Sequence, residues 1–432
     1  MQVYPRRPGK TSPDPRGREG QRPSSIARFQ IMVPAWERFS LPTRLLPAEK
    51  RELMARPRDC FLYEIADPGG YSGRFIEVGG RSFLNFGSYD YVGLARSPEL
   101  AEGARVAIER DGVQFPFPRA LLGAGEYAEL RALIEAMTER CVVIAPSTTL
   151  AHFGALPCIV EEGDAVLVEY AAHPSLHAAL ALVPGVPLET VSGDLRLLEE
   201  ALERRAPAHR RVWYVLDGID PLTGRRADLL GLSALLERFP SLHLYVDDAH
   251  ATSWFGKHGR GPTLARFADH ARVLVALSLN KAFSAAGAAL SFPSREWSER
   301  VEHSAGMLLS GAIPPPMLGA AVASARLHLA PDFLARQERL MARIRWVIAE
   351  AATRRVPLAD TDETPIFFLP CGTERRTREL LETLRNRGIY AGAVVPPFVD
   401  GPRAGVRFMV SVHNEREDVE RLITSFADVL AA

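Results

Sequence analysis

The sequence predicts an α/β protein with a large, mostly parallel sheet domain and a smaller C-terminal α+β domain. Its 432 residues exceed what one small hydrophobic core requires. From about residue 97 to about residue 300, short apolar runs alternate with amphipathic stretches of helical length. Buried strands that alternate with helices are typical of a parallel sheet that is covered on both faces.

The expected elements follow this alternation in chain order. Five apolar runs are expected to form the strands of the large sheet: Cys141–Ala145, Ala165–Glu169, Val212–Asp217, Leu242–Asp247 and Val273–Ser278. The amphipathic stretches predict helices at 129–139, Leu195–Arg205 and Leu229–Arg238. Two helical stretches are expected from about residue 315, followed by strands at 365–369 and 406–412 and helices at 373–388 and 415–430.

These elements divide the chain into four expected parts. Residues 1–30 are rich in proline, arginine, glycine and serine, and they predict a disordered basic arm because they cannot bury enough apolar surface to fold. Residues 31–96 form an N-terminal segment in which a helix precedes short strands. The large α/β domain is expected at 97–314, and the small domain with its linking helices at 315–432.

Composition argues against several classes of function. The formal net charge is zero, so no overall field attracts nucleic acid. No apolar run reaches the roughly 18 residues of a membrane span, and no signal-peptide core follows the N-terminus, so we expect a cytoplasmic protein. The cysteines are far apart and form no CxxC pair, which favours reduced thiols over a zinc site. They are Cys60, Cys141, Cys158 and Cys371.

Lysine is rare in this chain. Of 52 basic residues only four are lysines, at positions 10, 50, 257 and 281. Arginine serves wherever a basic residue only needs to be charged, so a remaining lysine can mark a place where an amine is required. Lys281 is surrounded by small and apolar residues, which suits a desolvated amine that forms a Schiff base. The simpler alternative is a lysine that only reaches solvent or an interface.

Polar side chains follow the expected strands, at the edge where open α/β sheets bind ligands. Ser147-Thr148-Thr149 opens a helix, and free amides at a helix start form an anion site that suits a phosphate, although these residues are also common caps. His173 follows the next strand, and a lone histidine there is more often a capping residue. Ser278 and Lys281 are three residues apart, close enough to serve the phosphate and the aldehyde of one ligand.

The most informative element is Asp247-Asp248-Ala249-His250 at the end of an expected buried strand, followed by Gly259-Arg260-Gly261. Two acids and a histidine at this position need a cationic partner. A metal ion and a structural salt-bridge network are two such partners. A pyridinium nitrogen is a third, because a carboxylate keeps it protonated and the ring then serves as an electron sink.

These residues resemble the motifs of the α-oxoamine synthases. This pyridoxal 5′-phosphate (PLP) family includes 8-amino-7-oxononanoate synthase, 2-amino-3-ketobutyrate CoA ligase, 5-aminolevulinate synthase and serine palmitoyltransferase. Residues 246–261 match the Asp-Glu/Asp-Ala-His…Gly-Arg-Gly signature, and 278–283 resemble Thr-x-Ser-Lys-Ala-Phe. Further matches lie at 85–94, 146–152, 217–229 and at Arg407 with His413. The resemblance implies the fold-type I, aspartate-aminotransferase-like PLP transferase fold and a homodimer.

The resemblance also implies a role for each matched residue. Lys281 would form the Schiff base with PLP and move the proton at the substrate α-carbon. Asp247 would pair with the ring nitrogen, His250 would hydrogen-bond the ring hydroxyl and His173 would stack on the ring. Arg407, one residue closer to His413 than is usual, would bind the amino-acid carboxylate near Tyr89. The residues implied to hold the phosphate or to lie beside the cofactor are Ser147, Thr148, Thr149, Asp217, Ser278 and Ser310, the last of them reaching the phosphate of a neighbouring subunit.

The implied reaction is the decarboxylative condensation of an α-amino acid with an acyl thioester, carried on CoA or on an acyl carrier protein, to give an α-amino ketone. Departures from the family motifs fit a specialised biosynthetic member: Tyr89 replaces Asn, Thr148 and Ala288 replace Gly, and Pro221 and Thr223 replace Ser and Asp. Two alternatives stay open. One is an aminotransferase or another fold-type I activity that uses the same Lys281 and Asp247. The other is a non-catalytic partner subunit of a heterodimeric synthase.

Overall fold

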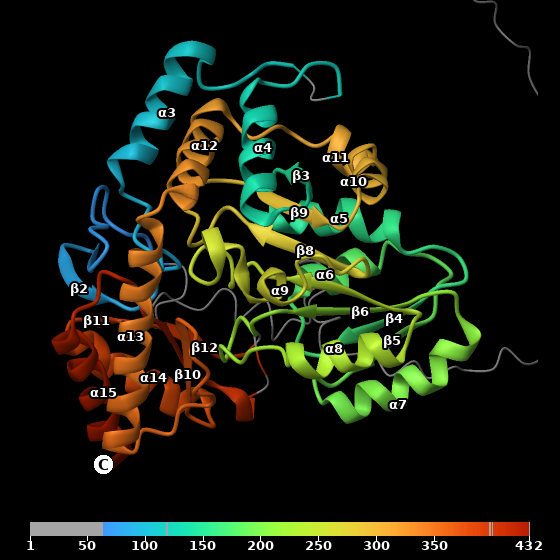
Figure 1. Ribbon diagram of the computed structural model, residues 1–432. Coiled ribbons are helices and arrows are strands. Elements are labelled where there is room, and N and C mark those ends of the chain that lie inside the picture. The colour runs from blue at the N-terminus through green and yellow to red at the C-terminus, as the bar shows by residue number, and fades with distance from the viewer. Residues whose placement is uncertain (1–63, 118–119, 397–398, 400, 432) are drawn as a thin grey trace, which may run out of the picture.

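The computed structural model describes residues 64–117, 120–396, 399 and 401–431. The arm expected at 1–30 and the first part of the segment at 31–96 lie outside these residues. A seven-stranded sheet at the centre has helices on both sides and the strand order β3-β9-β8-β7-β6-β4-β5 (Figure 1). Its strands are β3 (Cys141–Ala145), β4 (Ala165–Glu169), β5 (Leu188–Val191), β6 (Val212–Asp217), β7 (Leu242–Asp247), β8 (Val273–Ser278) and β9 (Ala288–Phe292).

The sheet confirms the mostly parallel architecture and all five expected strands, with the same bounds. Within it, β9 runs antiparallel to both of its neighbours, β3 and β8, while the other pairs are parallel. The sequence analysis did not identify β5 or β9. β5 is a four-residue, partly exposed edge strand, and β9 reads Ala-Ala-Leu-Ser-Phe, in which alanine has a weak strand preference.

Both faces of the central sheet are buried under helices. In β3, Val143 and Ala145 pack into the apolar core that also holds α5 (Thr148–Ile159) and α6 (Pro174–Leu180). Val142 and Ile144 pack into a second core. This division follows from the two-residue period of a pleated strand. The helices that contribute to the second core include α4 (Glu126–Thr138), α7 (Leu195–Arg205) and α8 (Leu229–Arg238).

Two helices, α12 (Pro315–Leu329) and α13 (Phe333–Arg354), lead from the large sheet to the C-terminal part of the chain (Figure 1). There β10 (Ile366–Pro370) and β12 (Gly392–Val394) both pair antiparallel with the central strand β13 (Gly405–Met409). Further helices are α9 (Gly261–Arg266), α10 (Arg295–Glu302), α11 (Ala305–Leu308), α14 (Glu374–Asn386) and α15 (Arg416–Ala431). The C-terminal elements expected from the sequence are therefore present, with bounds shifted by up to three residues.

The N-terminal segment joins the C-terminal part of the chain. β1 (Phe75–Val78) pairs with β2 (Arg81–Asn85), and β2 pairs with the distant β11 (Ile389–Tyr390). The chain then passes β13, where the Met409 amide donates to the Phe86 carbonyl oxygen (2.8 Å), before α3 (Pro98–Asp111) packs on α12. Residues 86–91 are thereby held between the sheet β1-β2-β11 and the sheet β10-β13-β12. Across the described part of the chain, no helix has both the length and the apolarity that a membrane crossing needs.

Candidate active site

The candidate site lies at one edge of the large sheet. Asp217, Asp247 and Ser278 end the neighbouring strands β6, β7 and β8, and parallel strands place their carboxyl ends at the same edge. The chain reverses after Ser278 and returns as β9, and Lys281 lies in this connection. The strand order therefore brings together three of the residues that the sequence singled out separately.

Lys281 is set apart from the other described lysine by its surroundings. Burial lowers the pKa of Lys281, although Asp247 and Tyr89 act in the opposite direction. Its Nζ lies 5.9 Å from the centre of the Tyr89 ring. Lys257, in contrast, is 57% exposed and pairs with Glu139 at 2.6 Å. A partly buried amine with a lowered pKa has more of the neutral form that attacks an aldehyde.

Asp247 is a buried carboxylate that is held ionised. Its Oδ2 accepts a hydrogen bond from Nε2 of His152 (2.9 Å), and its Oδ1 accepts one from the Ala249 amide (2.9 Å). Burial raises the pKa of Asp247, but His152 and Lys281 lower it more, to about 2. The other ring nitrogen of His152 is bonded to the Tyr245 hydroxyl at 2.9 Å. An ionised carboxylate at this place fits a protonated ring nitrogen.

His152 is a functional residue that the sequence analysis missed. It is the last residue of the 146–152 match, which carries no separate role for it. It is fully buried on α5, and Asp247 is 95 positions further along the chain. The signal available was a histidine one turn into a helix that starts at the ligand-binding edge of the sheet.

Asp248 does not share the position of Asp247. Its carboxylate accepts a hydrogen bond from the Thr263 hydroxyl (2.8 Å) and packs on two glycines, where an added Cβ would lie 1.9 Å away at Gly218 and 2.9 Å away at Gly261. Burial raises the pKa of Asp248 to about 7. Asp248 therefore stabilises the loop that follows β7, through its contacts with Thr263 and Gly261. Within the ranges that the structure describes, no three His, Cys, Asp or Glu side chains are grouped to hold a metal ion.

Two histidines with lowered pKa values flank this edge. His250 is buried and hydrogen-bonded through Nδ1 to the Tyr91 hydroxyl (3.0 Å). Burial and Lys281 lower the pKa of His250 well below its usual value, and burial also lowers the pKa of His173. His173 caps α6, and its amide donates to Oδ2 of Asp217 (2.6 Å). Both imidazoles are therefore neutral near pH 7.

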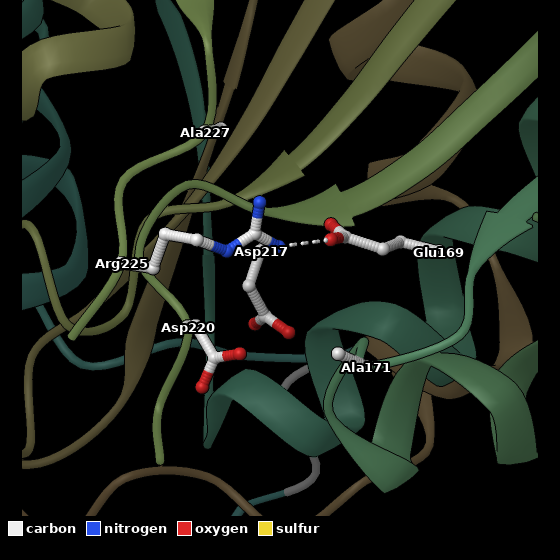
Figure 2. A pocket seen from close by; sticks show the side chains of 6 residues that line it. All are labelled: Glu169, Ala171, Asp217, Asp220, Arg225 and Ala227. Carbon is white, nitrogen blue, oxygen red and sulfur yellow. Dashed lines mark hydrogen bonds and ion pairs between the residues drawn. The ribbon is translucent and has the colours of Figure 1, made fainter. Parts of the chain in front are cut away.

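Asp217 borders a small cavity at the ends of β4 and β6 (Figure 2). Glu169, Asp220 and Arg225 line it as well, and Glu169 pairs with Nη2 of Arg225 at 3.0 Å. Burial and the neighbouring Asp247 raise the pKa of Asp217 well above its usual value. The sequence analysis did not identify Arg225. Its positive charge is paired with Glu169, one of the three acids that line the cavity with it. The raised pKa favours the protonated form of Asp217 next to Asp247.

The expected phosphate-binding residues lie on either side of β9. Ala145 at the end of β3 and Ser278 at the end of β8 are both paired with Ala288, which places the two strand ends about 10 Å apart. Ser147 caps α5 by accepting a hydrogen bond from the Leu150 amide (3.2 Å), and Thr148 and Thr149 form its first turn. This helix start is a site for an anion.

Arg407 and Tyr89 form the side of the site that faces the C-terminal sheet. Arg407 donates from Nη1 to the Tyr89 hydroxyl (3.1 Å), and its guanidinium lies 5.3 Å from the centre of that ring. Nε and Nη2 of Arg407 are buried and have no hydrogen-bond partner among the described residues. Tyr89 is 41% exposed. A buried guanidinium with two free donors fits a carboxylate, which accepts two parallel hydrogen bonds.

Ser310 is not brought into contact with these groups. It lies between α11 and α12, and its hydroxyl is buried without a hydrogen-bond partner among the described residues. Its expected role toward the phosphate of a second subunit stays a prediction.

The groups at the sheet edge fit PLP in type and charge. A partly buried amine, an ionised carboxylate, two neutral imidazoles and a helix start are the partners that its aldehyde, ring nitrogen, ring face and phosphate require. The groups that could meet these chemical needs are Lys281, Asp247, His173, His250 and the start of α5.

Comparison with known proteins supports PLP as the cofactor. A family model described as aminotransferase class I and II matches residues 81–426. An 8-amino-7-oxononanoate synthase from Maricaulis maris is 30% identical over 399 residues, covering 91% of this chain and 96% of the relative. Another, from Thermoanaerobacter pseudethanolicus, is 28% identical over 360 residues, covering 82% and 89%.

Solved structures share the fold. A serine palmitoyltransferase from S. paucimobilis, solved with a PLP-myriocin aldimine, superposes with a TM-score of 0.78 at 16% identity and covers 88% of this chain and 96% of its own. An 8-amino-7-oxononanoate synthase from Francisella tularensis has a TM-score of 0.69 at 17% identity, covering 81% and 98%. The chain belongs to the aminotransferase class I and II family, in its PLP-dependent α-oxoamine synthase branch.

Proposed function

We propose that this enzyme joins an α-amino acid to an acyl thioester with loss of CO₂ and releases an α-amino ketone. The observation that carries the proposal is the Arg407 guanidinium, whose Nε and Nη2 are buried without a partner among the described residues and suit an amino-acid carboxylate. Arg407 and Lys281 both lie beside the Tyr89 ring, at 5.3 and 5.9 Å from its centre. The relatives named 8-amino-7-oxononanoate synthase support the reaction class. The departures at Tyr89 and Thr148 support a specialised biosynthetic role.

The residues of the site divide the work of this reaction. PLP, once bound, supplies an electron sink next to the substrate α-carbon. Lys281 removes and returns the proton at that carbon, because its lowered pKa leaves more of the amine neutral. Asp247 keeps the ring nitrogen protonated, since its own pKa of about 2 leaves it ionised. Either His173 or His250 polarises the thioester carbonyl when the new carbon–carbon bond forms and the thiol leaves.

A thiol-release assay tests the proposal. A panel of amino acids is combined with acyl-CoA and with acyl carrier protein thioesters, and free thiol and CO₂ are measured together. We expect at least one pair to release both in equal amounts. An enzyme that releases no thiol with any pair, and instead passes the amino group to a keto acid, is an aminotransferase and rejects the condensation.

The partner-subunit alternative makes a different prediction. A non-catalytic subunit needs no amine at position 281, yet the chain keeps Lys281 where nearly every other basic residue is arginine. Borohydride reduction followed by peptide mapping separates the two. A PLP group attached to Lys281 supports the enzyme, while a protein that takes up no PLP supports the partner subunit.

We further propose a homodimer. Large apolar side chains are exposed in the connection between α3 and α4, including Val113 (72%), Leu121 (81%) and Leu122 (50%), and exposed apolar side chains in one connection favour a protein partner. A second copy covering it would agree with Ser310 serving the neighbour's phosphate. Light scattering should give the mass of two chains for the wild type and of one chain for Leu121→Asp.

A cytoplasmic location is part of the same proposal. The described cysteines, Cys141, Cys158 and Cys371, are free thiols, which suits a reducing compartment.

A further inference from the structure

We propose that Asp90 is a positioning residue that sets the Lys281 loop (279–287) at a fixed distance from the segment that carries Arg407. The inference rests on the proposed function, in which Lys281 and Arg407 hold two ends of one amino acid. Asp90 touches neither of them. It acts through its hydrogen-bond partners, which come from distant parts of the chain.

The Asp90 carboxylate is only 5% exposed and accepts five hydrogen bonds. Two of them come from the backbone amides of Leu94 (2.7 Å) and Ala95 (3.1 Å), and these close the local turn. The other donors are side chains of three separate segments: Tyr71 (2.9 Å), Ser284 (3.1 Å) and His413 (3.3 Å). A local turn would need only the first two, so the remaining three require another explanation.

Ser284 connects Asp90 to the Lys281 loop. It has a positive φ of 62°, which is costly for a serine, and its amide donates to the Lys281 carbonyl oxygen at 2.8 Å. Its hydroxyl also lies near the carbonyl oxygens of Lys281 and Ala282, at 3.3 and 3.4 Å. One hydroxyl hydrogen serves one strong bond, and the nearest acceptor is the charged Asp90. This bond helps to hold the tight turn directly after Lys281.

His413 connects Asp90 to the other side of the site. Its ring is enclosed by two glycines of positive φ, since an added Cβ would lie 2.7 Å from it at Gly73 and 3.0 Å from it at Gly93. His413 follows β13, the strand of Arg407. In between, the Val412 amide donates to the Tyr91 carbonyl oxygen at 2.9 Å. The position of β13 is thereby tied to the chain on the C-terminal side of Asp90.

The residues on either side of Asp90 reach the two halves of the site. Tyr89 accepts the hydrogen bond from Arg407, and Tyr91 is hydrogen-bonded to His250. A shift of Asp90 would therefore move both tyrosines and release the Lys281 loop. Because an amino acid must contact Arg407 and react at Lys281, such a shift would weaken its binding more than that of the thioester.

The test compares Asp90→Asn and Ser284→Ala with Ser298→Ala as a matched control. Among the described residues, the buried Ser298 hydroxyl bonds only to the Arg295 carbonyl oxygen of its own helix. We expect Asp90→Asn and Ser284→Ala to raise the KM for the amino acid about tenfold, with the KM for the thioester unchanged. Both should also speed hydrogen–deuterium exchange of residues 279–287 in the protein without cofactor. Ser298→Ala should do neither.

If Asp90→Asn fails to fold, Ser284→Ala still tests the inference, because Ser284→Ala leaves intact the hydrogen bonds from the Leu94 and Ala95 amides to Asp90. Unchanged exchange at 279–287 and an unchanged KM for the amino acid in Ser284→Ala would overturn the inference. The exchange measurement needs no turnover. It therefore separates a failure of this inference from a failure of the proposed condensation, which would show only in the thiol assay.

Discussion

Asp247 and Arg407 each bring a charge to the active site, but the protein supports them differently. Asp247 ends a central strand of the large sheet, and both of its oxygens accept hydrogen bonds, from His152 and Ala249. Arg407 lies on the small C-terminal sheet and has one protein partner, Tyr89, while its other two nitrogens have none among the described residues. One charge is satisfied within the protein, and the other is left for a ligand.

Under the proposed function, this difference distinguishes a cofactor side, at Asp247, from a substrate side, at Arg407. A buried donor without a partner costs about 1–3 kcal/mol, so the substrate side is assembled at a cost that a bound carboxylate would offset. The cofactor side carries no such cost, because His152 and Tyr245 extend its hydrogen bonds into the core. We therefore expect changes on the cofactor side to reduce turnover and changes on the substrate side to reduce affinity.

Lys281 lies between the two sides, and its removal should have the largest effect. Lys281→Ala should lower kcat by roughly 10²–10⁴-fold or more, because the amine that we propose moves the α-proton is lost. Lys281→Arg should not restore activity, since a guanidinium stays protonated and forms no Schiff base. Turnover and borohydride trapping measure both effects. Lys257→Ala, at an exposed lysine, is the control and should behave like the wild type.

Asp247 tests the cofactor side. Asp247→Asn should lower kcat by about 10²–10³-fold with little change in the KM for the amino acid, because the lost charge acts on the ring and not on the substrate carboxylate. A large rise in that KM with kcat preserved would contradict the separation of the two sides.

The pH dependence sharpens this test through His152. Burial raises the pKa of Asp247 and His152 lowers it, so His152→Asn should raise that pKa from about 2. A carboxylate with a higher pKa takes up its proton at a higher pH, so the acid limb of the kcat profile should move toward neutral pH. His303→Asn, at an exposed histidine on the surface, should leave the profile unchanged.

Arg407 tests the substrate side. Arg407→Lys should raise the KM for the amino acid about 10- to 100-fold and leave kcat at saturating substrate within a few-fold, because an ammonium cannot donate two parallel hydrogen bonds. The KM for the thioester should not change. Arg416→Lys replaces an exposed arginine that pairs with Glu420 and serves as the control. Equal effects on both substrates would place Arg407 outside the carboxylate site.

The two sides also differ in how far the sequence could predict them. Lys281, Asp247 and His250 stand in short segments at the ends of strands whose apolar runs were easily recognised, so their meeting followed from a parallel sheet. His152 was missed because its contact with Asp247 depends on the strand order. That order includes β9, whose small residues gave no clear strand signal.

On the substrate side, the pairing of Tyr89 with Arg407 could not be derived from local pattern. The two residues are 318 positions apart in the sequence. They meet because β2 pairs with β11 and because residues 86–91 run alongside β13 and the residues after it. Only the resemblance to a family placed them together. Arg225 and Ser284 had no local signal either, since each matters through one distant acidic partner, Glu169 or Asp90.

Tyr89 should show the smallest effect and gives the finest test of the comparison. Tyr89→Phe keeps the ring beside Lys281 and removes only the hydroxyl that accepts from Arg407. Loss of one such bond costs about 1 kcal/mol, so the KM for the amino acid should rise roughly fivefold while kcat stays unchanged. Tyr390→Phe, a matched change at a partly buried tyrosine of β11, is the control. If Tyr89→Phe lowered kcat and left the KM for the amino acid unchanged, Tyr89 would belong to the cofactor side. The boundary between the two sides would then lie between Tyr89 and Arg407.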